Sequence, residues 1–171
     1  MSGFAASLDP MDRVVIGNFN RSAFHIVRFG ANGALDPTFA GGQPVETHFP
    51  FIGVRVHGTV TDAAGNVIAW GQIAESGLLA RYRSTGELDP SFAGGKVLVP
   101  DVHSIVKILE QSDGKLVIVG SDGPNEMELA RYDAVCASGP HPGRPKSREY
   151  HRSGRMRTTI SFVPFGRVLS T

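Results

Sequence analysis

The sequence has almost no cysteine and no long hydrophobic run. A single cysteine, Cys136, excludes an intramolecular disulfide framework and a cysteine-based zinc site. No apolar stretch approaches the roughly 18 residues that a membrane helix needs, so we expect no membrane span. The first ten residues, MSGFAASLDP, lack the basic start and apolar stretch of a signal peptide. We therefore expect the chain as written not to be exported, unless it is a piece of a longer protein.

Charge is nearly balanced, so it does not indicate a partner. The chain carries 17 Lys and Arg and 16 Asp and Glu, for a net charge of +1. Its hydrophobic content of 41% and charged content of 19% are typical of a globular chain and exclude a disordered one. The 21 glycines and 11 prolines predict many turns, as all-β proteins have.

The strongest positive feature is an internal repeat. LDPTFAGG at 35–42 returns as LDPSFAGG at 88–95, an offset of 53 residues. The context repeats as well: the matched runs are IVRF at 26–29 with LARY at 79–82 and 129–132, and VVIG at 14–17 with IAWG at 68–71 and VIVG at 117–120. Such a period is the signature of a repeat architecture.

Each unit is interpreted as four strands, because short Val/Ile/Leu-rich runs alternate with Gly, Pro, Asn and Asp clusters. In unit 13–65 the expected strands are 13–19, 24–30, 42–49 and 54–62. In unit 66–114 they are 66–73, 77–84, 95–101 and 105–112. The incomplete unit 115–134 has two, 115–122 and 127–134. Residues 3–8 would be the last strand of a preceding unit. We therefore predict an all-β fold of tandem four-stranded antiparallel blades, about two and a half blades of a β-propeller. A β-solenoid is the alternative, although its repeats are usually shorter.

The turns between these strands have chemistry that supports the units. Asp113-Gly114 predicts a hairpin with a type I′ turn, and Gly65 can adopt the left-handed conformation at the matching place. In the LDP turns, Asp36 and Asp89 can accept backbone hydrogen bonds. A catalytic role for these aspartates is the weaker interpretation, since the same turn in every unit indicates a structural one. Phe39 and Phe92 are expected to fill the space between neighbouring sheets.

The sequence DGK, an apolar run ending in Gly, LARY and then LDPSF-x-GG resembles the delta-60 repeat. The resemblance covers about residues 3–134 and is best in the second unit. Met11-Asp12 stands where Asp-Gly is expected, and IVRF replaces LARY. The resemblance implies a β-propeller domain of large bacterial surface or secreted proteins. It implies no catalytic residues.

The segment 135–171 does not continue the repeat. It contains seven Lys and Arg and one acidic residue, a net of +6, which leaves −5 for the rest of the chain. Three interpretations stay open: an irregular, disordered basic tail, a tail that binds nucleic acid or anionic surfaces, and a slipped reading frame that makes the segment not an evolved continuation. The first is favoured over nucleic-acid binding.

No catalytic, metal or cofactor site is predicted. The histidines show no ligand spacing; they are His25, His48, His57, His103, His141 and His151. Asp113, Asp122 and Glu126 to Glu128 do not reproduce a calcium-loop spacing, and Cys136 has no activating charge near it. Trp70 is expected in the core. The ends of the presumed inner strands carry Gly17, Gly71 and Gly120, whereas an enzyme would place polar groups there.

The predicted function is therefore a non-catalytic repeat module for binding or structural display, with a protein or glycan ligand. The alternatives are a fragment of a propeller hydrolase or lyase, and nucleic-acid binding through the tail. Two and a half blades leave open sheet faces and unpaired strand edges. We therefore expect the chain to self-associate through those faces or to be only marginally stable.

Overall fold

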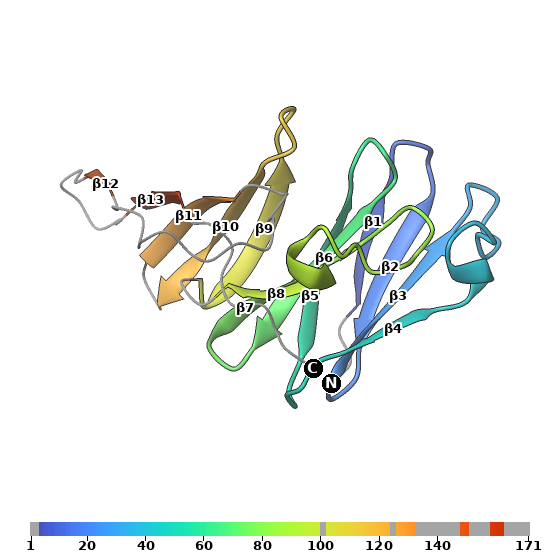
Figure 1. Cartoon of the computed structure of the whole chain (residues 1–171), viewed down its shortest axis with the longest axis horizontal. Coiled ribbons are helices and arrows are strands. Elements are labelled where there is room, and N and C mark those ends of the chain that lie inside the picture. The colour runs from blue at the N-terminus through green and yellow to red at the C-terminus, as the bar shows by residue number, and fades with distance from the viewer. Residues whose placement is uncertain (1–3, 100–101, 124–125, 133–147, 151–157, 163–171) are drawn as a thin grey trace.

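The computed structural model describes residues 4–99, 102–123, 126–132, 148–150 and 158–162, and every regular element of these residues other than two short 3-10 turns is a strand. The strands form three sheets that stand side by side in chain order, with the first at the right of Figure 1. The structure is thus an all-β, partial β-propeller, as the repeat predicts. Within the described residues there is no helix long and apolar enough to span a membrane.

Sheets 1 and 2 are four-stranded, antiparallel and built alike. Sheet 1 has the order β1-β2-β3-β4, with β1 Ala5–Leu8, β2 Val14–Phe19, β3 Ala23–Phe29 and β4 Val45–His48. Sheet 2 has the order β5-β6-β7-β8, with β5 Arg55–Thr61, β6 Val67–Ile73, β7 Ser76–Tyr82 and β8 Lys96–Val99. The 3-10 turns η1, Ala40–Gly42, and η2, Ala93–Gly95, end the two LDP loops.

Sheet 3 begins in the same way but ends differently. Its strands β9 Ser104–Glu110, β10 Leu116–Gly123 and β11 Glu126–Tyr132 are antiparallel. The other edge of β11 pairs in parallel with β13, Thr158–Phe162, which is antiparallel to β12, Arg148–Tyr150. The segment expected to be an irregular tail thus contains two short strands, and its remainder lies outside the described residues. An exposed strand edge can pair with any extended segment, with or without the repeat motif.

The sheets are out of phase with the sequence units by one strand. The last strand of each unit, expected at 54–62 and 105–112, is the first strand of the next sheet, β5 or β9. Of the strand expected at 3–8, Ala5–Leu8 likewise form β1 of sheet 1 and are not the end of an earlier blade. The physical reason is the tight turn after each of these strands, because it forces the strand to pair with its successor.

These tight turns are equivalent in all three sheets. In each, the first residue donates its amide to the carbonyl four positions later: Asp9 to Arg13, Asp62 to Asn66 and Gln111 to Lys115. The residue that precedes the accepting one has a left-handed backbone conformation, with φ of 57° at Asp12, 83° at Gly65 and 78° at Gly114. The hairpin at Asp113-Gly114 is confirmed. The type I′ turn is wrong, because Gly114 is left-handed and Asp113 is not.

Two hydrophobic cores fill the spaces between the sheets. Phe39 lies buried between sheets 1 and 2, and Phe92 and Trp70 lie buried between sheets 2 and 3. The filling roles of the two phenylalanines and the core position of Trp70 are therefore confirmed. The second strand of sheet 2, β6, is buried on both faces, as its continuous apolar sequence predicts.

Candidate functional site

The aspartate of the first LDP turn organises a buried polar cluster. Asp36 Oδ1 accepts hydrogen bonds from the Thr38 amide at 2.9 Å and the Thr38 hydroxyl at 2.6 Å, and Asp36 Oδ2 accepts one from Arg28 Nε at 2.8 Å. Arg28 is only 1% exposed and lies over the Phe39 ring, 4.7 Å from its centre. Both oxygens of Asp36 are thus engaged within the protein.

Arg28 also joins sheet 1 to sheet 2. Its guanidinium donates to the Ser84 carbonyl at 3.0 Å and the Gly65 carbonyl at 3.5 Å, both in turns of the second sheet. The equivalent Arg81 is more exposed and is paired with Asp62 at 3.2 Å and Asp89 at 3.4 Å. Each LDP aspartate therefore holds an arginine of the third strand of its sheet, and in sheet 1 this arginine also stabilises the packing on sheet 2.

The same contacts set the protonation of these carboxyls. Burial raises the pKa of Asp36, but the hydrogen bonds from Thr38 and then Arg28 outweigh burial and hold the pKa below its ordinary value. Burial also raises the pKa of Asp89. The hydrogen bonds from Ser91 and the charge of Arg81 outweigh burial, so this pKa too is lowered. The pKa of Asp9 is lowered against burial by bonds from Arg13 and Met11.

We therefore expect acid to destabilise the fold. A carboxyl whose pKa is depressed by folding contributes stability above its unfolded pKa, about 3.9 for Asp. That stability is lost as the pH falls through the folded value. Urea midpoints measured at intervals from pH 7 down to pH 2 should decline below about pH 4. Midpoints that stayed level down to pH 2 would contradict the depressed pKa values.

Glu110 provides an internal control for the acid experiment. Burial first, and the charge of Asp62 second, raise its pKa despite the opposing charge of Arg81. A carboxyl raised in this way favours the folded state at low pH and loses that contribution as the pH rises. Glu110→Gln should therefore remove a small gain on mild acidification and leave the decline below about pH 4 unchanged.

An enzyme of this fold would place polar groups on the strands at the inner edges of the sheets. β1 contacts β5 and β5 contacts β9, so these strands are the converging inner edges of the sheets. The glycines at 17, 71 and 120 lie instead on the second strands, β2, β6 and β10. The earlier placement of these three glycines on inner strands is therefore wrong.

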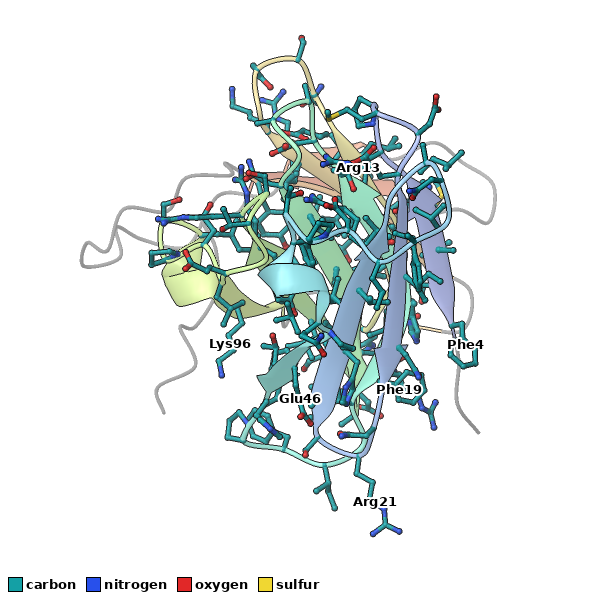
Figure 2. All side chains as sticks on the ribbon, turned by 90° about the vertical axis from the view of Figure 1, so that its right-hand side faces the viewer. Phe4, Arg13, Phe19, Arg21, Glu46 and Lys96 are labelled. Atoms are coloured by element: carbon teal, nitrogen blue, oxygen red, sulfur yellow. The ribbon has the colours of Figure 1, made fainter. Side chains whose placement is uncertain are left out.

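The inner strands present one equivalent residue each at the converging edge. A bulge between Val56 and Gly58 leaves His57 as the extra residue of β5, and the matching bulge leaves Val106 in β9. Phe4 stands at the same place before β1, and Figure 2 shows it projecting from that strand. Phe4 is 73% and Val106 68% exposed. Among these three positions only His57 has a polar side chain, and its Nδ1 lies 3.4 Å from the Ile105 carbonyl oxygen.

The histidines that the sequence leaves separate are partly brought together. Glu46 Oε1 on β4 lies 3.5 Å from Nε2 of both His25 and His48. The contact with His25 crosses from β4 to β3, so no spacing along the chain could reveal it, whereas His48 lies two residues from Glu46 on β4. In the part of the chain that the structure describes, no group of three or more His, Cys, Asp or Glu side chains has an arrangement that could hold a metal ion. His141, His151 and Cys136 lie outside the described residues.

A pocket of about 650 Å³ opens between sheets 1 and 2 at one end of the strands. Its walls are mainly apolar, and its only hydroxyl side chains are Ser22 and Ser76; the lining residues are Ser22, Phe49, Pro50, Phe51, Ile52, Ile73, Ala74 and Ser76. The volume falls within the range of small-ligand sites. The described lining residues can bind an apolar group, and none of them is an acid, a base or a metal ligand.

The pocket is built by the loop that connects the two sheets. Phe49 anchors the loop, since its ring packs edge-on against Phe24 at 4.9 Å and its amide donates to the Ser22 carbonyl at 2.8 Å. The Gly53 amide donates to the Arg21 carbonyl at 2.6 Å. Between these anchors Phe51 is 43% and Ile52 82% exposed, so the loop presents apolar side chains to solvent.

This loop is longer than its counterpart between sheets 2 and 3. The strand pairing marks equivalent ends of the two loops. At the start, Thr47 pairs with Phe24 as Val99 pairs with Gly77. At the end, Val56 pairs with Gly71 as Ile105 pairs with Gly120. Nine positions separate Thr47 from Val56, whereas six separate Val99 from Ile105. The three additional residues fall in the exposed apolar stretch. The two LDP motifs could not reveal this difference, because a comparison of spacings needs a third motif. The runs IVRF at 26, LARY at 79 and LARY at 129 are 53 and 50 residues apart, which shows that the units differ in length but not where.

Comparison with known families agrees with the fold. Residues 14–39 and 111–135 match a family model described as a domain of unknown function (DUF5122) β-propeller. The segments span 26 and 25 of the 171 residues and include β2, β3 and the first LDP turn, then β10 and β11. No curated protein and no solved structure matches the chain. The match and the sheets together show a β-propeller repeat domain.

Proposed function

We propose that this chain is a non-catalytic β-propeller module of the delta-60 repeat type, which binds a partner protein through the pocket between sheets 1 and 2. The observation that carries the proposal is the three-residue extension of the connecting loop, which exposes Phe51 and Ile52 beside an apolar pocket. Exposed apolar groups next to a concave surface are typical of interaction sites. A bacterial surface or secreted setting belongs to the same proposal and rests on the repeat resemblance.

A protein side chain fits this pocket better than a glycan does. Sugar hydroxyls need several hydrogen-bonding groups, whereas the side chains of the lining offer the two hydroxyls of Ser22 and Ser76. A Leu, Phe or Trp side chain would instead gain from burial against Phe51, Ile52 and Ile73. Lys96, a cationic side chain next to the start of the connecting segment, donates from Nζ to the His48 carbonyl at 2.7 Å.

The proposal of a non-catalytic role rests on the lining and on the inner edges of the sheets. Among the described residues that line the pocket, none has a titratable side chain. The equivalent bulge positions of the inner strands hold Phe4, His57 and Val106, which do not form an acid and base pair. A hydrolase or lyase is the alternative, and nucleic-acid binding through 135–171 stays a prediction, since most of that segment lies outside the described residues.

Chemical-shift mapping with indole, a model of an apolar side chain, tests the proposed site. Indole should shift amides of the loop 49–54 and of residues 73–76, with a dissociation constant of about 1 mM for a ligand of this size. The double variant Phe51→Ser, Ile52→Ser should weaken binding at least about fivefold. Met11→Ser, a control at an exposed apolar side chain of a distant turn, should leave binding unchanged.

Two outcomes would argue against the proposed function. Shifts caused by a methyl glycoside but not by indole would point to a glycan ligand. Hydrolysis of p-nitrophenyl acetate or p-nitrophenyl phosphate by the wild type, abolished by His57→Ala, would favour the enzymatic alternative. Self-association through the open sheet faces is proposed as a separate property, and it does not involve the pocket.

A further inference from the structure

The two interfaces between sheets are built from equivalent faces. In sheet 1, Val15 and Ile26 lie on the face toward sheet 2, which we call the forward face. In sheet 2 the forward positions are Ile68 and Leu79, which pack on sheet 3. Each forward face meets the rear face of the next sheet, whose members are Val67, Ala69, Ala80 and Tyr82 in sheet 2 and Leu116, Ile118, Ala130 and Tyr132 in sheet 3.

The rear face of sheet 1 has the same apolar character, although no described sheet precedes it. Four positions match the four rear residues of sheet 2, and they hold Val14, Ile16, Val27 and Phe29. Their counterparts in sheet 2 are fully buried, whereas these four are only half-buried. Leu8, paired with Val14 on the same face, is 67% exposed. Figure 2 views the molecule from this side.

The forward face of sheet 3 is apolar in the same way. Val117, Val119 and Leu129 occupy the positions of Ile68, Trp70 and Leu79, which are buried in sheet 2. All three are only half-buried in sheet 3. Leu109, opposite Val117 on β9, is 51% exposed. The described part of the chain thus has an uncovered rear face at sheet 1 and an uncovered forward face at sheet 3. The two faces are complementary, because equivalent faces pack on each other at the interfaces within the chain.

The outer end of the rear face departs from this pattern. His25 stands where sheet 2 has Leu78, Glu46 pairs with His25, and Asn18 stands where sheet 2 has Gly71. These polar residues border the apolar group and form a rim on one side of it. An apolar centre with a polar rim is the arrangement of a reversible protein interface.

We propose that a second copy of this chain closes the ring, with the forward face of sheet 3 in each copy packed on the rear face of sheet 1 in the other. Closed propellers contain four to eight blades. The described part of each chain provides three sheets, and six is the only multiple of three in that range, so two copies complete one ring. This inference deepens the self-association proposed above. It is independent of indole binding, because the pocket lies within one copy.

The oligomeric state of the full chain provides the first test. Sedimentation equilibrium at about 100 μM, well above a micromolar dissociation constant, should give twice the monomer mass of 18.2 kDa. Ile16→Glu places a charge on the rear face, and Val119→Glu places one on the forward face. Each variant alone should be monomeric, because both junctions of its dimer would contain a buried, unpaired charge. Ser112→Glu, on an exposed turn of sheet 3, is the control and should stay dimeric.

Mixing the two variants distinguishes head-to-tail closure from other dimers. An equimolar mixture retains one intact junction, formed by the forward face of the Ile16→Glu copy and the rear face of the Val119→Glu copy. It should therefore form a 1:1 dimer. Circular dichroism must show that each variant is folded, and Leu8→Glu and Leu109→Glu, at more exposed positions of the same faces, replace any variant that is not.

Three results would overturn the inference. The first is a wild-type monomer at about 100 μM. The second is a dimer that survives Val119→Glu but not Ile16→Glu, since it would join like faces. The third is an open polymer, which would keep the head-to-tail contact but exclude a closed ring of six sheets.

Discussion

Asp36→Asn should lower the free energy of unfolding by about 3–5 kcal/mol, the usual cost of removing one partner of a buried ion pair. Asn preserves the size of the side chain and can still accept from the Thr38 amide. It cannot neutralise Arg28, which is 1% exposed and has Asp36 as its carboxylate partner at 2.8 Å. The guanidinium would then be a buried, uncompensated charge between sheets 1 and 2.

The repeat contains a matched control for this substitution. Asp89→Asn changes the equivalent aspartate, but Arg81 keeps Asp62 as a second carboxylate at 3.2 Å and is more exposed than Arg28. The loss at Asp89 should therefore be about 1–2 kcal/mol. Urea unfolding at pH 7, followed by tryptophan fluorescence, measures both. Equal losses at the two sites would show that the buried charge is not what makes Asp36 important.

A double-mutant cycle separates the ion pair from the turn. Arg28→Met replaces the guanidinium with an apolar chain of similar length that can still lie over Phe39. In the Arg28→Met background, Asp36→Asn should lower the free energy of unfolding by only about 1 kcal/mol. This loss would come from weaker hydrogen bonds between Thr38 and the side chain at position 36. A full 3–5 kcal/mol in that background would place the effect in the LDP turn and not in the pair.

The elements that sequence could predict are those set by local chemistry. The LDP turns, the left-handed glycines of the tight turns, the burial of Phe39 and Phe92 and the core position of Trp70 each follow from a short motif whose residues suffice to determine the conformation. The strand positions were predicted to within a few residues for the same reason. The phase of the sheets was not, because four strands per unit can be grouped in more than one way. Only pairing across the unit boundary decides the grouping.

The candidate site could not be predicted, since it depends on a difference between the units. The loop from Thr47 to Val56 matters because it is longer than its equivalent, and its Phe51 and Ile52 are ordinary apolar residues in the sequence. The approach of His25 to Glu46 likewise requires the register of β3 with β4. A pattern search finds what repeats, whereas a binding site in a repeat protein arises where one unit departs from the others.

The strand register also corrects the alignment of Gly17, Gly71 and Gly120, the glycines that end the three apolar runs. Val14 pairs with Phe29 as Val67 pairs with Tyr82 and Leu116 with Tyr132, so these three positions are equivalent. Gly71 and Gly120 then correspond to Asn18, and Gly17 corresponds to Trp70. The sequence match of VVIG with IAWG and VIVG is therefore displaced by one residue. Two of the glycines are structurally alike and the third is not.

Gly71→Ala should be among the most destabilising single substitutions in this chain, with a loss of at least about 3 kcal/mol in the free energy of unfolding. A Cβ at Gly71 would overlap the Arg55 carbonyl oxygen, where the bulge in β5 brings the two backbones together. Backbone atoms cannot turn aside as a side chain can, so the β5–β6 pairing would have to open. Gly120→Ala should behave similarly, since its Cβ would lie 2.5 Å from the Ser104 carbonyl oxygen at the equivalent bulge.

Gly17→Ala is the control that distinguishes the two alignments. Its three nearest neighbours would be side-chain methyl groups, of Val56 at 2.9 Å, Thr59 at 3.1 Å and Ile26 at 3.5 Å, which can move by a few tenths of an ångström. The loss should therefore stay within about 1 kcal/mol, partly offset because Ala is less costly than Gly in a strand. If the sequence match described the structure, all three substitutions would be equally damaging. Urea midpoints that separate Gly71 and Gly120 from Gly17 would establish the register of the sheets, and with it the assignment of the forward and rear faces on which ring closure depends.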